Sequence, residues 1–316
     1  MFRRTFQSYS STFLKQAYRN ASTVGFIGIG QMGSNMSSNL LKNGHKVVVY
    51  DSNSEAVRSL VSAGATAASS VADLASQSDR VITMLPTPDI VKAVYRGSDG
   101  VFANAKKGSI LIDSSTVGPE PPQELAPEAK DKGLTFIDAP VTGAVPAARD
   151  GTLTFLVGGT ESEAASIKEL LLSMGKNVVH CGPTGSGQIA KICNNMCLAI
   201  TMIGTAETLA LAKRLGLDPK LMTDILNISS GRSWSSEVYN PAPGIMDKVP
   251  SSNDYKPGFS VELLAKDLGL AQNAATRVKA PLPLGGPSHQ MYLTMQANGW
   301  SKKDFSSVYK FLEEKS

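Results

Sequence analysis

The stretch Gly28-Ile-Gly-Gln-Met-Gly33 decides how the folded part of this chain begins. It follows an apolar run, Val24–Ile29, and opens a segment with helical spacing, Met32–Asn43. In a βαβ unit the first glycine allows a tight turn, the second lets the backbone approach a pyrophosphate, and the third lets helix and strand pack closely. The helix N-terminus then offers free N–H groups to the phosphates. A glycine turn without a ligand is the alternative. The predicted cofactor contacts in this turn are Gly28, Gly30, Gln31, Met32 and Gly33.

An acidic residue stands where a dinucleotide site needs one. Asp51 follows the second predicted strand, Lys46–Tyr50, and lies 23 residues after Gly28. A carboxylate at this place accepts hydrogen bonds from the adenosine ribose hydroxyls and repels a 2′-phosphate. No Arg or Lys lies between Asp51 and Arg58 to offset that repulsion. The pattern therefore favours NAD over NADP.

Strand-like and helical segments alternate through the first half of the chain. Beyond the first two, strands are predicted at Arg80–Leu85, Ser109–Ile112, Leu134–Asp138, Leu153–Val157 and Asn177–His180. This alternation indicates the α/β class, with a Rossmann-type, doubly wound and mainly parallel sheet. After Gly187 strand signals nearly vanish, and Gln188–Leu215 is predicted as one long helix. We predict a dinucleotide-binding domain over 23–182 and an all-α substrate and oligomerisation domain over 183–316.

The first 22 residues differ in composition from the rest of the chain. They hold four basic residues and no acid, since the first acid is Asp51. Phe2, Phe6, Tyr9 and Phe13 recur at helical spacing, so a helix would place them on one face. An acid-poor amphipathic segment is typical of a mitochondrial transit peptide, and a disordered tail is the alternative. We predict a transit peptide over 1–22 and a location in the mitochondrial matrix.

Composition argues against several kinds of partner. Without the four basic residues of the first segment, the 31 Lys and Arg fall to the number of Asp and Glu, 27. A neutral body argues against nucleic-acid binding, and no continuous apolar run approaches the ~18 residues of a membrane span. The three histidines and three cysteines show no metal-ligand spacing, so no metal is predicted. Cys181, Cys193 and Cys197 are predicted to be buried free thiols in a reducing compartment.

Residues that end predicted strands are candidates for ligand contact. Leu85, Pro86 and Thr116 lie at carboxyl ends of strands, where ligands bind in this topology. The hydroxyls near Thr116 would equally suit the cap of the next helix. Thr142 and Gly143 follow another strand, and their small neighbours leave backbone amides exposed for an anionic group such as a carboxylate. An ordinary strand-to-loop turn is favoured there by position alone.

Two charged positions in apolar helical segments are candidates for the chemistry. Lys191 and Asn195 lie four residues apart on the long helix and share one face. A lysine in apolar surroundings has a lowered pKa and exchanges a proton with an alcohol, and an asparagine orients the same oxygen. A snorkelling lysine on a polar helix face is the favoured alternative for the pair alone. Lys266 lies in the apolar run Val261–Ala271 and is a possible further site.

Several separate blocks together resemble the β-hydroxyacid dehydrogenase family, from about Val24 to Leu312. The blocks are Gly25–Gly33, Met84–Pro86, Asp113–Thr116, Asp138–Gly143, Gly151–Phe155, Gly185–Asn195, Ser229–Ser236, Tyr239–Pro241, Lys266–Ala271 and Asp304–Val308. The resemblance implies NAD-dependent oxidation of a small hydroxy acid, here 3-hydroxyisobutyrate to methylmalonate semialdehyde in valine breakdown. It also implies a homo-oligomer, a dimer or tetramer, built on the long helix.

The resemblance implies roles for the candidate residues. Lys191 matches the catalytic lysine, as general acid and base, and Asn195 matches its partner. Thr142 and Gly143 match the loop that holds the substrate carboxylate. Lys266 matches a lysine near substrate and nicotinamide, while Leu85, Pro86 and Thr116 match cofactor contacts. The loop usually reads Ser-Gly-Gly and here reads Thr142-Gly143-Ala144, which narrows the pocket.

Two other functions fit parts of the pattern. An NADPH-dependent reductase of glyoxylate or succinic semialdehyde shares the fold and the lysine, but Asp51 argues against it. A non-catalytic dinucleotide-binding oligomerisation module is expected to lose the lysine, whereas Lys191 and Asn195 are both present.

Overall fold

The computed structural model describes residues 22–314. The chain divides into two compact units, Met1–Lys191 and Ile192–Ser316. All but the last residue of the predicted transit peptide lies outside the described residues. The domain boundary predicted at residue 183 stays a prediction.

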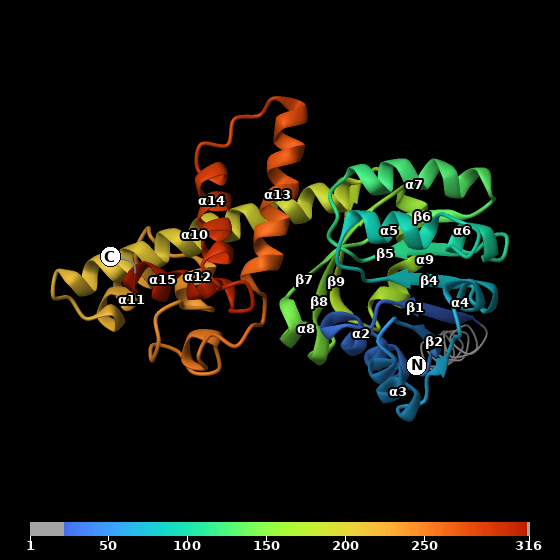
Figure 1. The fold of residues 1–316 in the computed structure, drawn as a ribbon, viewed down its shortest axis with the longest axis horizontal. Helices are drawn as coiled ribbons and strands as arrows, with labels where there is room; N and C mark the ends of the chain where they lie inside the picture. Colours follow the sequence, from blue (N-terminus) through green and yellow to red (C-terminus); the bar gives the residue numbers. More distant parts are fainter. Residues whose placement is uncertain (1–21, 315–316) are drawn as a thin grey trace, which may run out of the picture. The chain divides into compact units, whose positions relative to one another are not determined.

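The first unit is built on a nine-stranded sheet in the order β3-β2-β1-β4-β5-β6-β8-β7, with β9 paired to β8 (Figure 1). The strands are β1 (Thr23–Ile27), β2 (Lys46–Tyr50), β3 (Thr66–Ala67), β4 (Arg80–Thr83), β5 (Ile110–Asp113), β6 (Thr135–Asp138), β7 (Val141–Thr142), β8 (Leu153–Gly158) and β9 (Gly175–Gly182). The pairs from β3 through β6 are all parallel, and β8 runs antiparallel to β6 and β7. The predicted Rossmann-type, mainly parallel sheet is confirmed.

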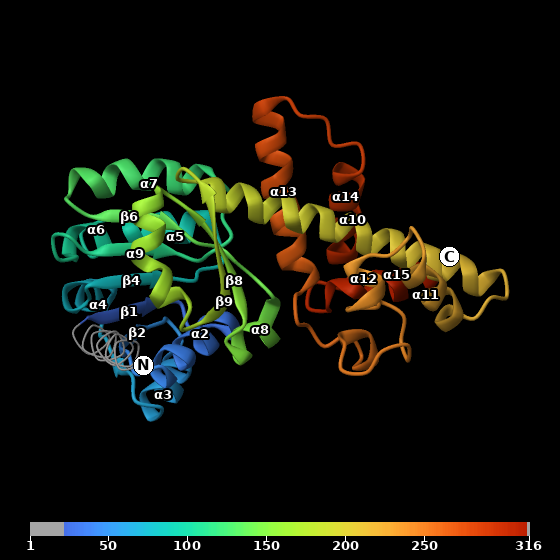
Figure 2. The same ribbon diagram turned by 180° about the vertical axis from the view of Figure 1, so that it is seen from behind.

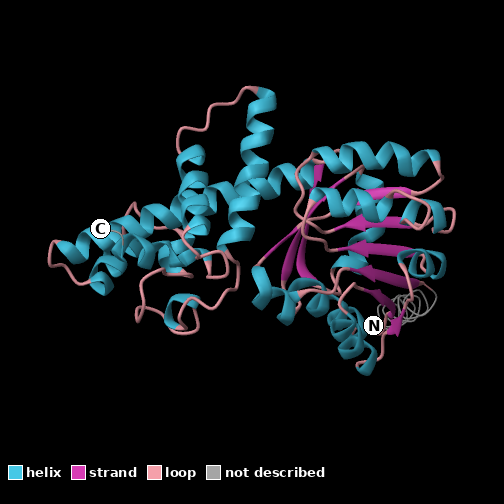
Figure 3. Ribbon diagram, in the orientation of Figure 1, coloured by secondary structure: helices cyan, strands magenta, loops and turns pink. Residues whose placement is uncertain are grey.

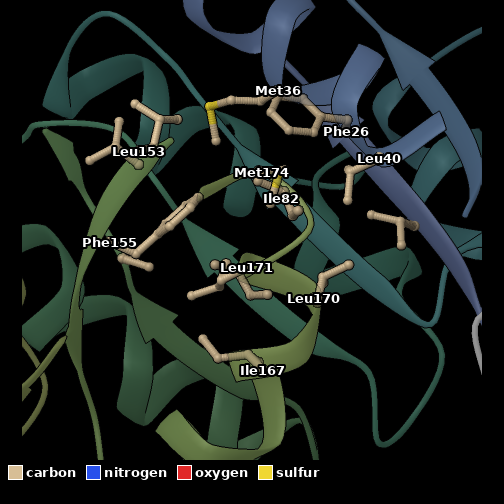
Figure 4. Packing of buried hydrophobic residues seen from close by; sticks show 14 of the residues in the cluster. Phe26, Met36, Leu40, Ile82, Leu153, Phe155, Ile167, Leu170, Leu171 and Met174 are labelled. Carbon is tan, nitrogen blue, oxygen red and sulfur yellow. The ribbon is translucent and has the colours of Figure 1, made fainter. Parts of the chain in front are cut away.

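Helices cover both faces of the sheet, as Figure 3 shows with helices in cyan and strands in magenta. They are α2 (Gln31–Lys42), α3 (Ser54–Ser62), α4 (Val71–Gln77), α5 (Pro88–Tyr95), α6 (Val101–Asn104), α7 (Glu120–Asp131), α8 (Ala144–Asp150) and α9 (Glu161–Leu171). Because successive strand residues point to opposite faces, Phe26 lies in the core that includes side chains of α2, α3 and α9. Ile27 lies in the core on the other face, which includes side chains of α4 to α7. Figure 2 shows the face that α9 covers. Figure 4 shows Phe26 beside Met36 and Leu40 of α2 in this core.

Some predicted boundaries in the first unit were wrong. β1 ends at Ile27 rather than Ile29, because Gly28 has a φ of +90° and turns the chain out of the strand. Strand β7 and helix α8 were not predicted. The pairing of β7 with β8 comes from contacts that local propensity does not encode.

The second unit is helical, as predicted. Helix α10 (Ser186–Arg214) begins in the first unit and continues into the second. It is followed by α11 (Pro219–Ile228), α12 (Trp234–Glu237), α13 (Val261–Val278), α14 (Gly285–Ala297) and α15 (Val308–Glu314). Their core gathers apolar side chains such as Met202, Leu264 and Phe305. Pro287 lies in the first turn of α14, where proline is tolerated.

Helix α10 is also the described helix that is long and apolar enough to cross a membrane by length and composition. Its buried residues Ala199, Met202 and Leu209 pack in the core of the second unit, the usual place of an apolar helix in a globular unit.

The prediction of buried thiols was wrong for two cysteines on this helix. Cys193 and Cys197 are exposed, because Ile192 and Asn195 carry the buried face at these turns.

Candidate active site

The glycine turn after β1 has the geometry that each of its three glycines predicts. Gly28 has a φ of +90°. A Cβ at Gly33 would lie 2.0 Å from the Gly28 carbonyl oxygen, so only glycine lets α2 start this close to the strand. A Cβ at Gly30 would meet no described atom within 4 Å. The backbone of Gly30 therefore lies open at the start of α2, whose first turn contains no acid.

Asp51 holds this turn in place. One carboxylate oxygen of Asp51 accepts a 2.7 Å hydrogen bond from the backbone N–H of Ile29. The other accepts a 2.7 Å bond from Asn53 N–H. The side chain is half-buried at the carboxyl end of β2. Asp51 thus joins the glycine turn to the end of the next strand.

A buried polar cluster joins the ends of β4 and β5. Asp113 is fully buried, and one of its oxygens accepts hydrogen bonds from Thr83 Oγ1 at 2.7 Å and Ser115 Oγ at 2.6 Å. Ser115 Oγ in turn accepts a 2.8 Å bond from the N–H of Leu85. Burial raises the pKa of Asp113 to about 6, against the opposing hydrogen bonds from Ser115 and Thr83. The hydroxyls do not cap the next helix, since α7 begins at Glu120 with Pro119 at its N-cap.

The start of α10 is anchored on the end of β6. Asp138, fully buried, accepts hydrogen bonds from the N–H of Gly185 at 2.7 Å and of Gln188 at 3.1 Å. Burial raises the pKa of Asp138, while these backbone N–H groups lower it. A carboxylate at a helix N-terminus is favourable because it faces the positive end of the helix dipole. Lys191 follows one turn later and is only 9% exposed.

The Thr142–Ala144 loop leads from β7 into α8. Thr142 pairs with Thr154 of β8 and is half-buried. Gly143 has a φ of +128°, and a Cβ there would lie 2.5 Å from Ala147 Cβ. Ala144 has a φ of +56°, a conformation that favours glycine. The loop is therefore a strained turn with the Gly143 backbone exposed.

In the second unit a buried carboxylate gathers two of the predicted site residues. Asn195 Nδ2 donates a 2.6 Å hydrogen bond to Asp267 Oδ2. Lys266 Nζ forms an ion pair with Asp267 Oδ1 at 3.1 Å. The side chain of Asp267 is only 3% exposed, whereas that of Lys266 is 25% exposed. The carboxylate of Asp267 thus holds the side chains of both Asn195 and Lys266 in place.

Four residues that hold these side chains were missed or only touched on: Asp113, Asp138, Gln188 and Asp267. Each carries a buried side chain with several hydrogen bonds or an ion pair. The sequence offered a signal for the three acids, because Asp113 and Asp138 end predicted strands and Asp267 lies in an apolar helical run. Nothing in the sequence around Gln188 indicated its role. In the described part of the chain, no group of three His, Cys, Asp or Glu side chains could hold a metal ion.

These features define a dinucleotide-binding protein of the Rossmann type. Residues 23–182 match the family described as the NAD binding domain of 6-phosphogluconate dehydrogenase, so the first unit carries an NAD-binding domain. Residues 185–312 match the family described as NAD-binding of NADP-dependent 3-hydroxyisobutyrate dehydrogenase.

Comparison with whole proteins points to the same family of dehydrogenases. The chain is 56% identical to bovine (Bos taurus) mitochondrial 3-hydroxyisobutyrate dehydrogenase, over 92% of this chain and 87% of the relative. It is 43% identical to an NAD-dependent L-serine dehydrogenase from Pseudomonas aeruginosa, over 92% and 97%. Mycobacterium tuberculosis 3-hydroxyisobutyrate dehydrogenase, solved with L-serine, superposes with a TM-score of 0.87 at 38% identity, covering 92% of this chain and 99% of that one. The chain belongs to the 3-hydroxyisobutyrate dehydrogenase family, which confirms the resemblance to β-hydroxyacid dehydrogenases.

Proposed function

We propose that this chain oxidises 3-hydroxyisobutyrate to methylmalonate semialdehyde with NAD as cofactor, a step of valine breakdown. The observation that carries the proposal is the buried Lys191, one helical turn before Asn195 on α10, in a chain 56% identical to a named 3-hydroxyisobutyrate dehydrogenase. A lysine kept this far from solvent on an anchored helix is suited to proton transfer with an alcohol.

The residues of the first unit fit NAD. The open backbone at Gly30 and the acid-free first turn of α2 suit a pyrophosphate. Gly28, Gln31, Met32 and Gly33 complete that turn, and Asp51 suits the adenosine ribose. Leu85, Pro86 and Thr116 would contact the rest of the cofactor, and Lys266 of the second unit is proposed as a further contact. Asp51 favours NAD, although one matching family is described as NADP-dependent.

The chain's own residues would handle the substrate as follows. Backbone and hydroxyl groups of Thr142 and Gly143 bind the carboxylate. The Lys191 amine takes the proton of the hydroxyl group, and Asn195 orients the same oxygen. NAD supplies the acceptor for the hydride that leaves the carbinol carbon as the carbonyl forms. The resulting lysine ammonium stabilises negative charge on that oxygen.

Lys191→Ala tests the proposal directly. We expect NADH formation from 3-hydroxyisobutyrate to fall by at least about 100-fold, as for loss of a general acid or base, while NADH binding stays within about twofold. Lys213→Ala is the matched control, because Lys213 lies on the same helix in an exposed ion pair with Glu313. Near-normal turnover of Lys191→Ala would refute the proposal. A panel that includes L-serine, glyoxylate and succinic semialdehyde, each with NAD and NADP cofactors, separates the rival activities.

We further propose that the chain forms a homo-oligomer through α10 and α11. Three large apolar side chains are exposed there: Leu211 at 59%, Leu215 at 78% and Ile228 at 86%. Such side chains are the usual content of a self-association surface. Light scattering should give the mass of at least a dimer for the wild-type protein. The double variant Leu211→Lys/Leu215→Lys should have the mass of a monomer. A monomeric wild-type protein would overturn this.

We also propose the mitochondrial matrix as its location. The bovine relative is named as mitochondrial, and residues 1–22 are basic and free of acid. A fusion of residues 1–22 to a fluorescent protein should enter mitochondria and resist added protease until the inner membrane is opened. A cytosolic fusion would contradict the proposal.

A further inference from the structure

We propose that Gln188 is a positioning residue that fixes Lys191 against the loop after β5 and so sets the reacting geometry. The inference rests on the proposed function, because the roles of Lys191 and Thr116 come from it. Gln188 touches neither substrate nor cofactor in this proposal. It acts through the two segments that it joins.

The Gln188 amide is fully buried and uses both of its ends. Its Oε1 accepts hydrogen bonds from the N–H of Val117 at 3.0 Å and of Gly118 at 3.2 Å. Its Nε2 donates a 2.8 Å bond to the Ser115 carbonyl. These three backbone groups flank Thr116 on both sides. The amide therefore fixes the backbone of the residue that is expected to contact the cofactor.

The helix side of Gln188 is fixed equally well. Its own N–H donates to Asp138 Oδ2 at 3.1 Å. The preceding Gly187 has no room for a side chain, since a Cβ there would lie 2.2 Å from the Leu156 carbonyl oxygen of β8. The first turn of α10 is thus held on β6 and β8. Lys191 lies three residues further along the same helix, so its backbone is fixed with that turn.

On the side of the loop after β5, the hydrogen bonds continue to the end of β4. Ser115 Oγ donates to Asp113 and accepts from the N–H of Leu85, at 2.6 and 2.8 Å. The loops after β4 and β5 and the start of α10 therefore form one continuous hydrogen-bonded frame, all of it within the first unit. Gln188 is the side chain in this frame that bridges helix and loop.

Two variants separate positioning from mere stability. Gln188→Glu keeps the shape and both acceptor contacts of Oε1, but above the carboxyl pKa it turns an oxygen without a proton toward the Ser115 carbonyl. When protonated, the glutamic acid again donates to that carbonyl. Burial favours the protonated form, so this recovery should fall within a measurable pH range. Gln188→Met keeps a similar volume but loses all three hydrogen bonds at every pH.

A third variant controls for stability. Ser173→Ala removes the buried 2.9 Å contact between His45 Nε2 and Ser173 Oγ. His45 directly precedes the amino end of β2. The contact therefore lies at the amino ends of the strands, whereas the Gln188 frame lies at the carboxyl ends of β4 and β5. Its loss should lower the melting temperature without changing kcat.

The experiment measures kcat, the KM for NAD, NADH binding by fluorescence and the melting temperature from pH 6 to 9. At pH 8.5 we expect both Gln188 variants to lose about 10- to 100-fold in kcat, since small misplacement of a reacting group costs this much. NADH binding should weaken severalfold. As the pH falls from 8.5 to 6, the kcat of Gln188→Glu relative to wild type should rise at least fivefold. The relative kcat of Gln188→Met should stay unchanged over the same range.

The proposal is overturned if both variants keep kcat within twofold of wild type while folded. It is equally overturned if their loss of kcat matches that of Ser173→Ala at equal melting temperature and does not respond to pH. Failure of the proposed function looks different, because Lys191→Ala would then retain turnover. The NADH-binding readout of the Gln188 variants does not depend on that result.

Discussion

The Asn195 amide nitrogen lies 2.6 Å from a carboxylate oxygen of Asp267, a buried acid on α13. Because a carboxylate only accepts hydrogen bonds, this contact fixes which end of the amide faces Asp267. The amide oxygen of Asn195 is therefore turned the other way, where it accepts a 3.2 Å bond from Asn194. Lys266 lies 3.1 Å from the second oxygen of Asp267. One acid thus sets the orientation of an amide and the position of an ammonium group.

Asp267→Ala should lower kcat more than Asp267→Asn. Alanine leaves Asn195 free to rotate its amide and leaves Lys266 without its ion pair with Asp267. Asparagine still offers an oxygen to Asn195 and loses the ion pair alone. We expect about a tenfold difference in kcat between the two variants, which corresponds to about 1.4 kcal/mol, the upper part of the range that a hydrogen bond between neutral groups contributes. Steady-state assays with 3-hydroxyisobutyrate measure it, and equal kcat values would show that Asn195 needs no fixed orientation.

Asp51→Ser should weaken NAD binding and relax the choice of cofactor. The substitution removes the acceptor of the Ile29 N–H bond and the negative charge that opposes a 2′-phosphate. We expect the KM for NAD to rise about tenfold and the ratio of NADP to NAD activity to rise by at least as much. Asp79→Ser is the control, because Asp79 also accepts a backbone N–H, that of Thr23 at 2.8 Å, but at the amino end of β1. An unchanged cofactor ratio in Asp51→Ser would contradict this role.

The buried Asp113 should make stability depend on pH in an unusual direction. Burial raises its pKa from 3.8 to about 6, so the folded protein holds this proton over a range in which the unfolded chain releases it. The stability that this proton gives is full below the ordinary pKa and is lost as pH rises through about 6. Between pH 5 and 7.5, wild type should lose about 1.4 kcal/mol of unfolding free energy relative to Asp113→Asn.

Urea unfolding of both proteins at the two pH values measures this difference. Asp150→Asn serves as the control, because Asp150 is an exposed carboxyl in an ion pair with Arg149. It should follow the pH dependence of wild type. Parallel stability profiles for wild type and Asp113→Asn would show that Asp113 is ionised throughout.

Gly143→Ala should damage the predicted carboxylate loop. The new Cβ would lie 2.5 Å from Ala147 Cβ, on a backbone with a φ of +128°. We expect a loss of at least about 2 kcal/mol in unfolding free energy and a higher KM for the hydroxy acid at unchanged NADH binding. Ala144→Gly is the matched change, since it relaxes a residue with a φ of +56°. It should leave stability equal or higher by up to about 1 kcal/mol, and a larger loss than in Gly143→Ala would refute the strain argument.

Local patterns predicted most of the architecture. The alternation of apolar runs with helical segments predicted the parallel sheet, because buried strands and helices each need their own period of apolar residues. The long helix α10 was predicted to within two residues at each end, since Gly216 cannot extend it well. Strand β7, helix α8 and the exposure of Cys193 were not predictable, because they depend on which distant segments pack there.

The sequence by itself determined the cofactor turn. The spacing of Gly28, Gly30, Gly33 and Asp51 requires a strand, a turn and a helix in that order, and these are local properties of the backbone. The tertiary structure decided which side chains hold the chemistry in place. Gln188 meets the Ser115–Gly118 loop across 70 residues or more of chain, and Asn195 meets Asp267 across 72. Such contacts follow from packing of whole elements, so that no local pattern around Lys191 indicates them.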